Sequence, residues 1–91
     1  MATLVIDTTF GQSTACVVDE KKNCYISTNS LDQKQSESIA VVVKKSLEKS
    51  QLDINNIRNI IVTNGPGNFT SIRVGVSFAL GISNGISVPL Y

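Results

Sequence analysis

The 91-residue sequence contains no histidine and no tryptophan, and only 16% of its residues are charged. The absence of histidine excludes imidazole general bases, histidine-dependent serine and cysteine catalytic sites, and zinc sites with histidine ligands. Average domains carry about 25% charged residues. The low charge therefore predicts a surface that is either polar but uncharged or partly apolar, and an apolar surface on a small domain usually has a partner.

The few charges nearly cancel, since eight Lys and Arg against seven Asp and Glu give a formal net charge of +1. Proteins that bind nucleic acid through their own surface are usually strongly basic, so direct binding to tRNA, DNA or an anionic membrane is not expected. No apolar run reaches the roughly 18 residues of a membrane span, and Asp7 comes too early for a signal peptide. We expect a cytoplasmic protein in which Cys16 and Cys24 are reduced thiols.

The first third of the chain has the pattern of three short strands. β-Branched runs over residues 3–7, 13–19 and 23–28 are separated by polar or glycine-containing turns. Runs of this length and composition are typical of strands. Because the connections are short, we expect an antiparallel meander.

The remaining two thirds alternate between helix and strand patterns. A four-residue apolar period over 32–50 predicts an amphipathic helix, a short apolar run over 59–63 predicts a buried strand, and residues 69–85 predict a second helix. The apolar segment 86–91 has the pattern of another strand. The whole chain, residues 1–91, thus reads as a single α/β domain of order β-β-β-α-β-α-β, with three antiparallel strands followed by parallel ones.

Both predicted helices differ from ordinary surface helices. Three consecutive valines, residues 41–43, widen the apolar arc of the first helix beyond one contact face. The second helix contains Gly75, Gly81 and Gly85, and each glycine costs about 0.5–1 kcal/mol relative to alanine. We expect another element to approach the backbone of the second helix closely at these glycines.

Two features could carry chemistry, and the residues leave their roles open. The turn over 64–70 joins a strand to a helix N-terminus, which is a geometry that binds phosphate, but it lacks the lysine of a phosphate-binding loop and the third glycine of a dinucleotide motif. Its glycines could equally permit a tight turn. Asp7, followed by Thr8, ends the first strand, where it could hold a ligand or accept local hydrogen bonds. Arg73 could meet a substrate anion or a group of its own fold.

Three motifs occur in order along the chain: Ile6-Asp7-Thr8-Thr9, then Gln35-Ser36-Glu37, then the turn and the helix start after it. The motif residues of this last segment are Gly65, Pro66, Gly67, Phe69, Thr70, Arg73 and Gly75. Together the motifs resemble those of the TsaB (YeaZ) family of tRNA threonylcarbamoyladenosine biosynthesis proteins. Gln35 and Ser71 stand where that family has histidine and glycine, so no ligand role is carried over to them.

The resemblance covers the whole chain and about the first half of a family member. It implies the N-terminal subdomain of an actin-like ATPase (ASKHA) fold, which has a ribonuclease-H-like sheet. It also implies a non-catalytic accessory subunit that, with TsaD and the ATPase TsaE, supports threonylcarbamoyl transfer to adenosine 37 of tRNAs reading A-starting codons. ATP and metal would be held by TsaD and TsaE, this chain would hold no cofactor, and tRNA would be bound only by the assembled complex.

The resemblance further implies that the two helices bind TsaD, or a second copy of the chain to give a homodimer. By position, the interface would consist of Ile39, Val42, Val43, Leu47, Val74, Ser77, Phe78 and Gly81. Two alternatives remain. One is a small phosphoryl-transfer or ATP-hydrolysing fragment that uses Asp7, Thr8 and the turn, and the other is an inactive, self-associating remnant of a truncated protein.

Overall fold

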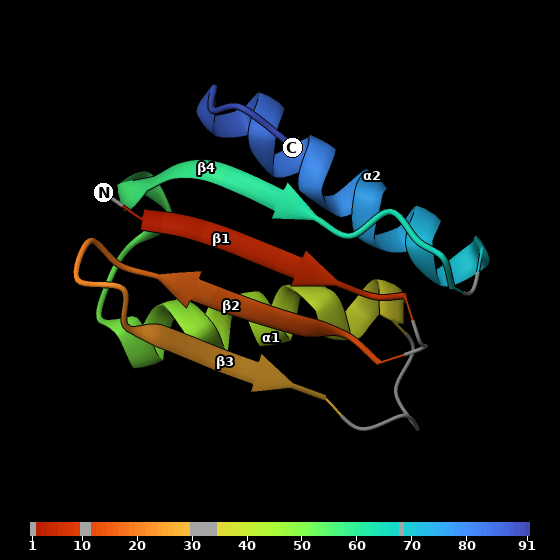
Figure 1. The fold of residues 1–91 in the computed structure, drawn as a ribbon, viewed down its shortest axis with the longest axis horizontal. Coiled ribbons are helices and arrows are strands. Elements are labelled where there is room, and N and C mark those ends of the chain that lie inside the picture. The colour runs from red at the N-terminus through yellow and green to blue at the C-terminus, as the bar shows by residue number, and fades with distance from the viewer. Residues whose placement is uncertain (1, 10–11, 30–34, 68) are drawn as a thin grey trace.

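Four strands form one mixed sheet in the computed structural model (Figure 1). They are β1 (Ala2–Asp7), β2 (Thr14–Val18), β3 (Cys24–Thr28) and β4 (Ile57–Val62). The strand order is β3-β2-β1-β4, with antiparallel pairs in the meander and a parallel pair between β1 and β4. The structure describes residues 2–9, 12–29, 35–67 and 69–91, without the side chains of residues 35–37 and 69. The predicted mixed α/β class is confirmed.

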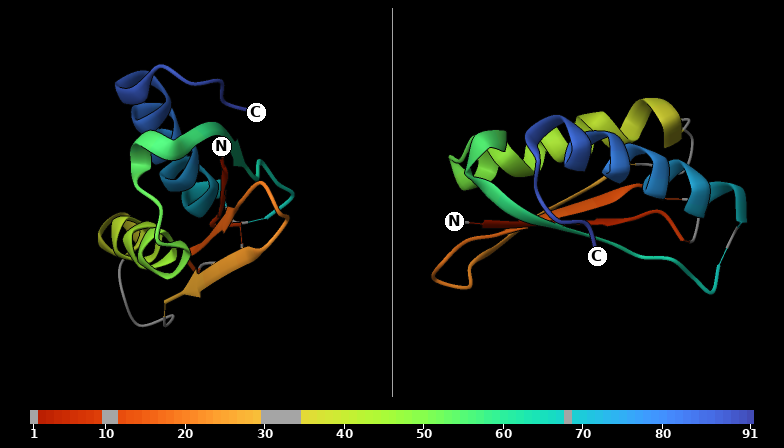
Figure 2. Two further views of the ribbon diagram at one scale, coloured as in Figure 1. Left: turned by 90° about the vertical axis from the view of Figure 1, so that its left-hand side faces the viewer. Right: turned by 90° about the horizontal axis from the view of Figure 1, so that it is seen from above.

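Two long helices, α1 (Gln35–Ser50) and α2 (Phe69–Ile86), cover the same face of the sheet (Figure 2). A single 3-10 turn, η1 (Ile54–Asn56), joins α1 to β4. Among the residues that the structure describes, no helix covers the opposite face, which we call the open face. No described helix is long and apolar enough to cross a membrane.

The alternation of side chains along β1 explains why one face is covered. Ala2, Leu4 and Ile6 are buried, whereas the residues between them are only half-buried. Successive side chains of a strand point to opposite faces, so the buried set faces the helices. The core also contains residues of β2, both helices and β4, namely Ala15, Val17, Ile39, Val42, Val43, Ile57, Ile60 and Ala79.

Serines fasten α1 to the sheet inside this core. The Ser46 hydroxyl donates to the Ala15 carbonyl at 2.9 Å, and the Ser13 and Ser38 hydroxyls lie 3.0 Å apart. All three serines are buried. Because a buried hydroxyl without a partner is costly, these bonds let polar residues occupy core positions.

The last residues extend the sheet beyond β4. Ile60 N donates to Pro89 O at 3.0 Å, Tyr91 N donates to Ile60 O at 2.8 Å, and Val62 N donates to Tyr91 O at 3.0 Å. Leu90 forms a parallel bridge with Ile60. The strand pattern predicted for 86–91 thus corresponds to parallel pairing that begins near Pro89, after α2 ends at Ile86.

Candidate functional site

Asp7 is held at the end of β1 by three hydrogen bonds that all end on Oδ1. Thr9 donates from its backbone N–H at 2.9 Å and from its hydroxyl at 2.7 Å. Thr63, which follows β4, donates from its hydroxyl at 2.8 Å. Burial alone would raise the pKa of Asp7, but these hydrogen bonds outweigh it and lower the pKa from its ordinary value of 3.8. The ionised carboxylate therefore ties the ends of two parallel strands together, as the local hydrogen-bonding interpretation predicts.

Thr8 connects the same strand end to α2. It is fully buried, and its hydroxyl donates to the Ser71 carbonyl at 2.6 Å. A Cβ placed on Gly75 would overlap Thr8 Oγ1. The close approach predicted for Gly75 is thus confirmed, and Thr8 has a packing role.

The turn between β4 and α2 passes equally close to the chain after β1. Gly65 has a φ of 114°, which is a left-handed conformation that favours glycine. A Cβ on Gly67 would lie 2.5 Å from Thr9 O. Gly65, Pro66 and Gly67 are exposed. The glycines thus provide the tight-turn geometry, and phosphate binding by the turn stays a prediction.

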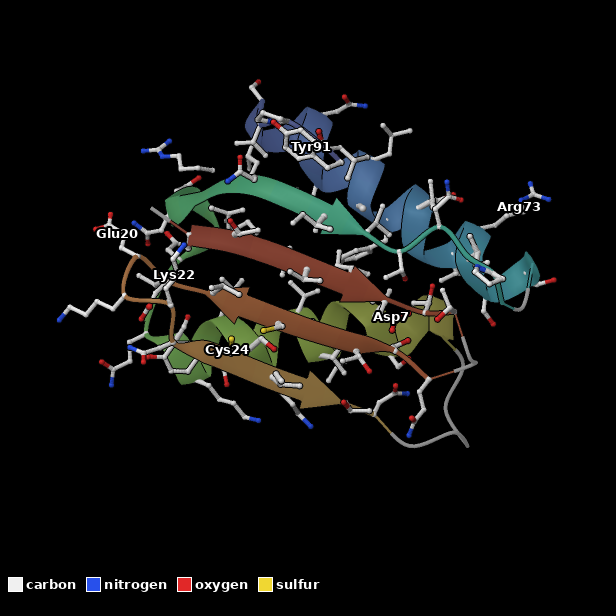
Figure 3. All side chains as sticks on the ribbon, viewed as in Figure 1. Asp7, Glu20, Lys22, Cys24, Arg73 and Tyr91 are labelled. Carbon is white, nitrogen blue, oxygen red and sulfur yellow. The ribbon has the colours of Figure 1, made fainter. Side chains whose placement is uncertain are left out.

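Arg73 lies apart from the other predicted chemical groups, which adjoin the end of β1. Arg73 is exposed on α2 and extends away from Asp7 (Figure 3). The described residues contain no group of three or more Cys, Asp or Glu side chains that could hold a metal ion. Asp7, Thr8 and the turn are neighbours, and every bond described for Asp7 is internal to the fold.

A groove of about 550 Å³ lies between the first halves of α1 and α2. Its apolar lining is Ile39 from α1 and Val74 and Phe78 from α2, and its polar lining is Thr70, Arg73 and Ser77. Aromatic and arginine side chains are enriched in the cores of protein interfaces. The composition of this groove suits a protein partner.

A second groove of about 460 Å³ lies beside the second half of α1. Val43 and Leu47 of α1 and Ile82 of α2 line it, with Lys44 and Glu48 among its polar residues. Both grooves involve α1 and α2, so we refer to them together as the interhelical groove.

Six of the eight predicted interface residues line the interhelical groove. Val42 packs in the core and does not line either part. Ile39 and Val43 are also nearly fully buried, and they form the floor of the groove. Gly81 is exposed on α2, outside the lining of either part.

The prediction missed further groove residues, both from α1 with the segment after it and from α2, namely Ala40, Lys44, Glu48, Gln51, Leu52, Asp53, Ile54, Thr70, Arg73 and Ile82. Most of them lie one, three or four positions from residues that were predicted. Residues at these spacings lie on the same or an adjacent face of a helix, so helical spacing could have identified those on α1 and α2. It could not have identified Leu52, Asp53 and Ile54, which follow α1.

The chain matches a family model described as TsaD, tRNA N6-adenosine threonylcarbamoyltransferase, over residues 28–91. It is 36% identical over 58 residues to a tRNA N6-adenosine threonylcarbamoyltransferase of Geotalea daltonii, covering 64% of this chain and 17% of that protein. It is 25% identical over 88 residues to a tRNA threonylcarbamoyladenosine biosynthesis protein TsaB of Buchnera aphidicola, covering 97% of this chain and 41% of that protein. The chain therefore spans less than half the length of either relative.

The fold matches that of YeaZ from Pseudomonas aeruginosa with a TM-score of 0.89. The two chains are 17% identical, and the match covers 99% of this chain and 43% of YeaZ. This match supports the ASKHA-type fold class that the sequence motifs predict. The chain belongs to the family that the TsaD model describes, and its resemblance to the TsaB (YeaZ) proteins of tRNA threonylcarbamoyladenosine biosynthesis is confirmed.

Proposed function

We propose that this chain is a non-catalytic, cytoplasmic partner subunit in threonylcarbamoyladenosine formation at position 37 of tRNA, and that it docks on a TsaD-type transferase through the interhelical groove. The observation that carries the proposal is the groove itself. Most of the residues that the family resemblance assigns to the interface line it. TsaE would join the assembled complex, and tRNA would contact that complex rather than this chain alone.

The surface of α2 beside the groove supports docking of another backbone. Gly81 and Gly85 follow Val74 and Phe78 at spacings of three, four and seven residues, so the four residues share one side of the helix. Apart from the neighbouring residues and the backbone of α2 itself, no atom of the described residues lies within 4 Å of a Cβ built on Gly81 or Gly85. On this side of α2, Val74 and Phe78 form an apolar surface, and Gly81 and Gly85 carry no side chains. A partner backbone therefore has room to approach the helix closely.

Co-elution of the purified chain with a TsaD-type transferase tests the proposal. We expect a complex that Ser77→Arg abolishes, because Ser77 is exposed and lines the groove, and a long cationic side chain there would block it. Leu80→Arg is the matched control. Leu80 is 49% exposed on α2 and does not line the groove, so this variant should still co-elute.

Two results would contradict docking through the groove. The first is a folded chain that forms no complex with the transferase at micromolar concentration. The second is a complex that survives Ser77→Arg as well as Leu80→Arg. Sedimentation of the chain alone, with the same two variants, reports whether a second copy uses the same surface.

A further inference from the structure

Two cysteines lie side by side on the open face of the sheet. Cys16 is on β2 opposite Ile26, and Cys24 is on β3 opposite Val18. The register makes the two cysteines diagonal neighbours across the β2–β3 pair, and their side chains share a face. Both are free thiols; Cys16 is half-buried and Cys24 is exposed.

The register brings the two thiols close enough to influence each other. Burial, as the largest cause, and the proximity of Cys24 raise the pKa of Cys16. Cys24 lies at the start of β3 (Figure 3), and its Sγ is 4.0 Å from the Lys22 carbonyl. No described helix covers this face, so a small molecule can reach Cys24 directly.

We propose that Cys16 and Cys24 form a reversible disulfide across β2 and β3 when the chain meets hydrogen peroxide or a small-molecule disulfide. With peroxide, the Cys24 thiolate attacks one oxygen, the O–O bond breaks, and Cys24 sulfenic acid and water form. The Cys16 sulfur then attacks the Cys24 sulfur, the S–O bond breaks, and a second water leaves. Two thiols are oxidised by two electrons, and one peroxide is reduced to two waters.

A small-molecule disulfide such as oxidised glutathione gives the same product by exchange. The Cys24 thiolate attacks one glutathione sulfur and releases the first glutathione thiol. Cys16 then attacks the Cys24 sulfur of the mixed disulfide and releases the second. The exposed residue therefore reacts first, and the half-buried residue resolves the intermediate.

The diagonal placement explains why the bond would be reversible. Diagonal neighbours in an antiparallel pair have Cα atoms about 7–8 Å apart, whereas disulfides usually join Cα atoms about 4.4–6.8 Å apart. Closing the bond must draw β2 and β3 together locally. Cellular thiols readily reduce disulfides under such strain. The Cys16–Cys24 bond would therefore form and break with the redox state of the surroundings.

Counting the free thiols after oxidation tests whether Cys16 and Cys24 form this disulfide. The folded chain is treated with oxidised glutathione, denatured, alkylated and weighed by mass spectrometry. We expect both thiols to disappear together in a monomer that keeps no glutathione, and dithiothreitol to restore both. Cys16→Ser should instead retain glutathione on Cys24.

A positional control separates proximity from general thiol reactivity. The double variant Cys16→Ser/Thr14→Cys moves the first thiol two residues along β2, so that it stays on the same face but lies opposite Thr28. Closure with Cys24 should then be at least about tenfold slower, because the thiols no longer meet. Circular dichroism confirms that each variant folds.

Either of two results would overturn the proposal. One is a wild-type chain that keeps glutathione on Cys24 while Cys16 remains alkylatable. The other is equal closure rates in wild type and in the folded Cys16→Ser/Thr14→Cys variant, which would show that the diagonal contact confers nothing.

Discussion

The two ends of α2 contain the same residue type in opposite surroundings. Near its start, Gly75 packs so tightly against Thr8 that a Cβ would overlap the Thr8 hydroxyl. Near its end, a Cβ built on Gly81 or Gly85 meets no other element of the described chain within 4 Å. One end of the helix is fastened to β1, and the other presents bare backbone.

The sequence predicts that another element approaches α2 closely at all three glycines, and the outcome differs between them. Close approach of another element is confirmed for Gly75, but within the described chain it is wrong for Gly81 and Gly85. The physical reason is register, because Gly75 faces the sheet with Ser71 and Ala79, whereas Gly81 and Gly85 face outward. A glycine in a helix thus indicates contact only once its face is known.

The largest effect is expected from Gly75→Ala. The new methyl group would overlap the buried Thr8 hydroxyl, and overpacking of this kind costs about 1–3 kcal/mol. Urea unfolding followed by circular dichroism measures the change in the free energy of unfolding. The matched control is Gly85→Ala on the same helix, and equal stability of the two variants would remove the proposed difference between the ends.

A smaller effect of opposite sign is expected from Gly81→Ala. With open space around the Cβ, the alanine should stabilise the isolated chain by about 0.5–1 kcal/mol through helix propensity. The same methyl group should weaken co-elution with a TsaD-type transferase. A variant that is more stable and binds unchanged would show that no partner approaches Gly81.

The smallest effect concerns the hydrogen-bonded carboxylate of Asp7 and its response to pH. Because the folded-state pKa of Asp7 is below its ordinary value of 3.8, its stabilising contribution is complete above that value and is lost as the pH falls through the folded-state pKa. We expect Asp7→Asn to flatten part of the decline in thermal stability below about pH 4.

Asp19 provides the comparison for this measurement. Its pKa is also lowered, chiefly by the Asn23 backbone N–H, but it lies in the β2–β3 turn away from α2. Asp7→Asn should raise amide exchange at Thr9 and Thr63, where β1 and β4 end, at neutral pH, and Asp19→Asn should not. Identical exchange in both variants would show that Asp7 does not tie the ends of β1 and β4 together.

Much of the fold follows from patterns that the sequence shows directly. The alternation in β1 and the four-residue period in α1 each report one buried face, so the element types and their order are predictable. The turn around Gly65 and Gly67 is predictable because only glycine tolerates its conformation and its close contact. β4 begins at Ile57 rather than at 59, because Ile57 pairs with Ala2 across the sheet, and no local pattern reports such pairing.

The buried polar residues could not be predicted in the same way. Ser46 and Thr8 are fully buried because each donates to a distant carbonyl, Ala15 O and Ser71 O respectively. Such bonds join residues far apart in the chain, so hydrophobic periodicity does not indicate them. The interhelical groove depends on the same long-range packing, which is why its outline was only partly predicted.

The neighbours of β1 in the sheet have a consequence for the order of folding. On one side β1 pairs with β2, the next strand in the chain, and on the other it pairs with β4, as in the Thr3 and Asn59 pair. Contacts between nearby segments form faster than contacts that must close a long loop. The meander can therefore assemble while β1 still has an unpaired edge, and β4 reaches that edge only after the intervening chain has been ordered or looped out. During synthesis, the half of the sheet that leaves the ribosome first is also the half that needs the least of the chain to form.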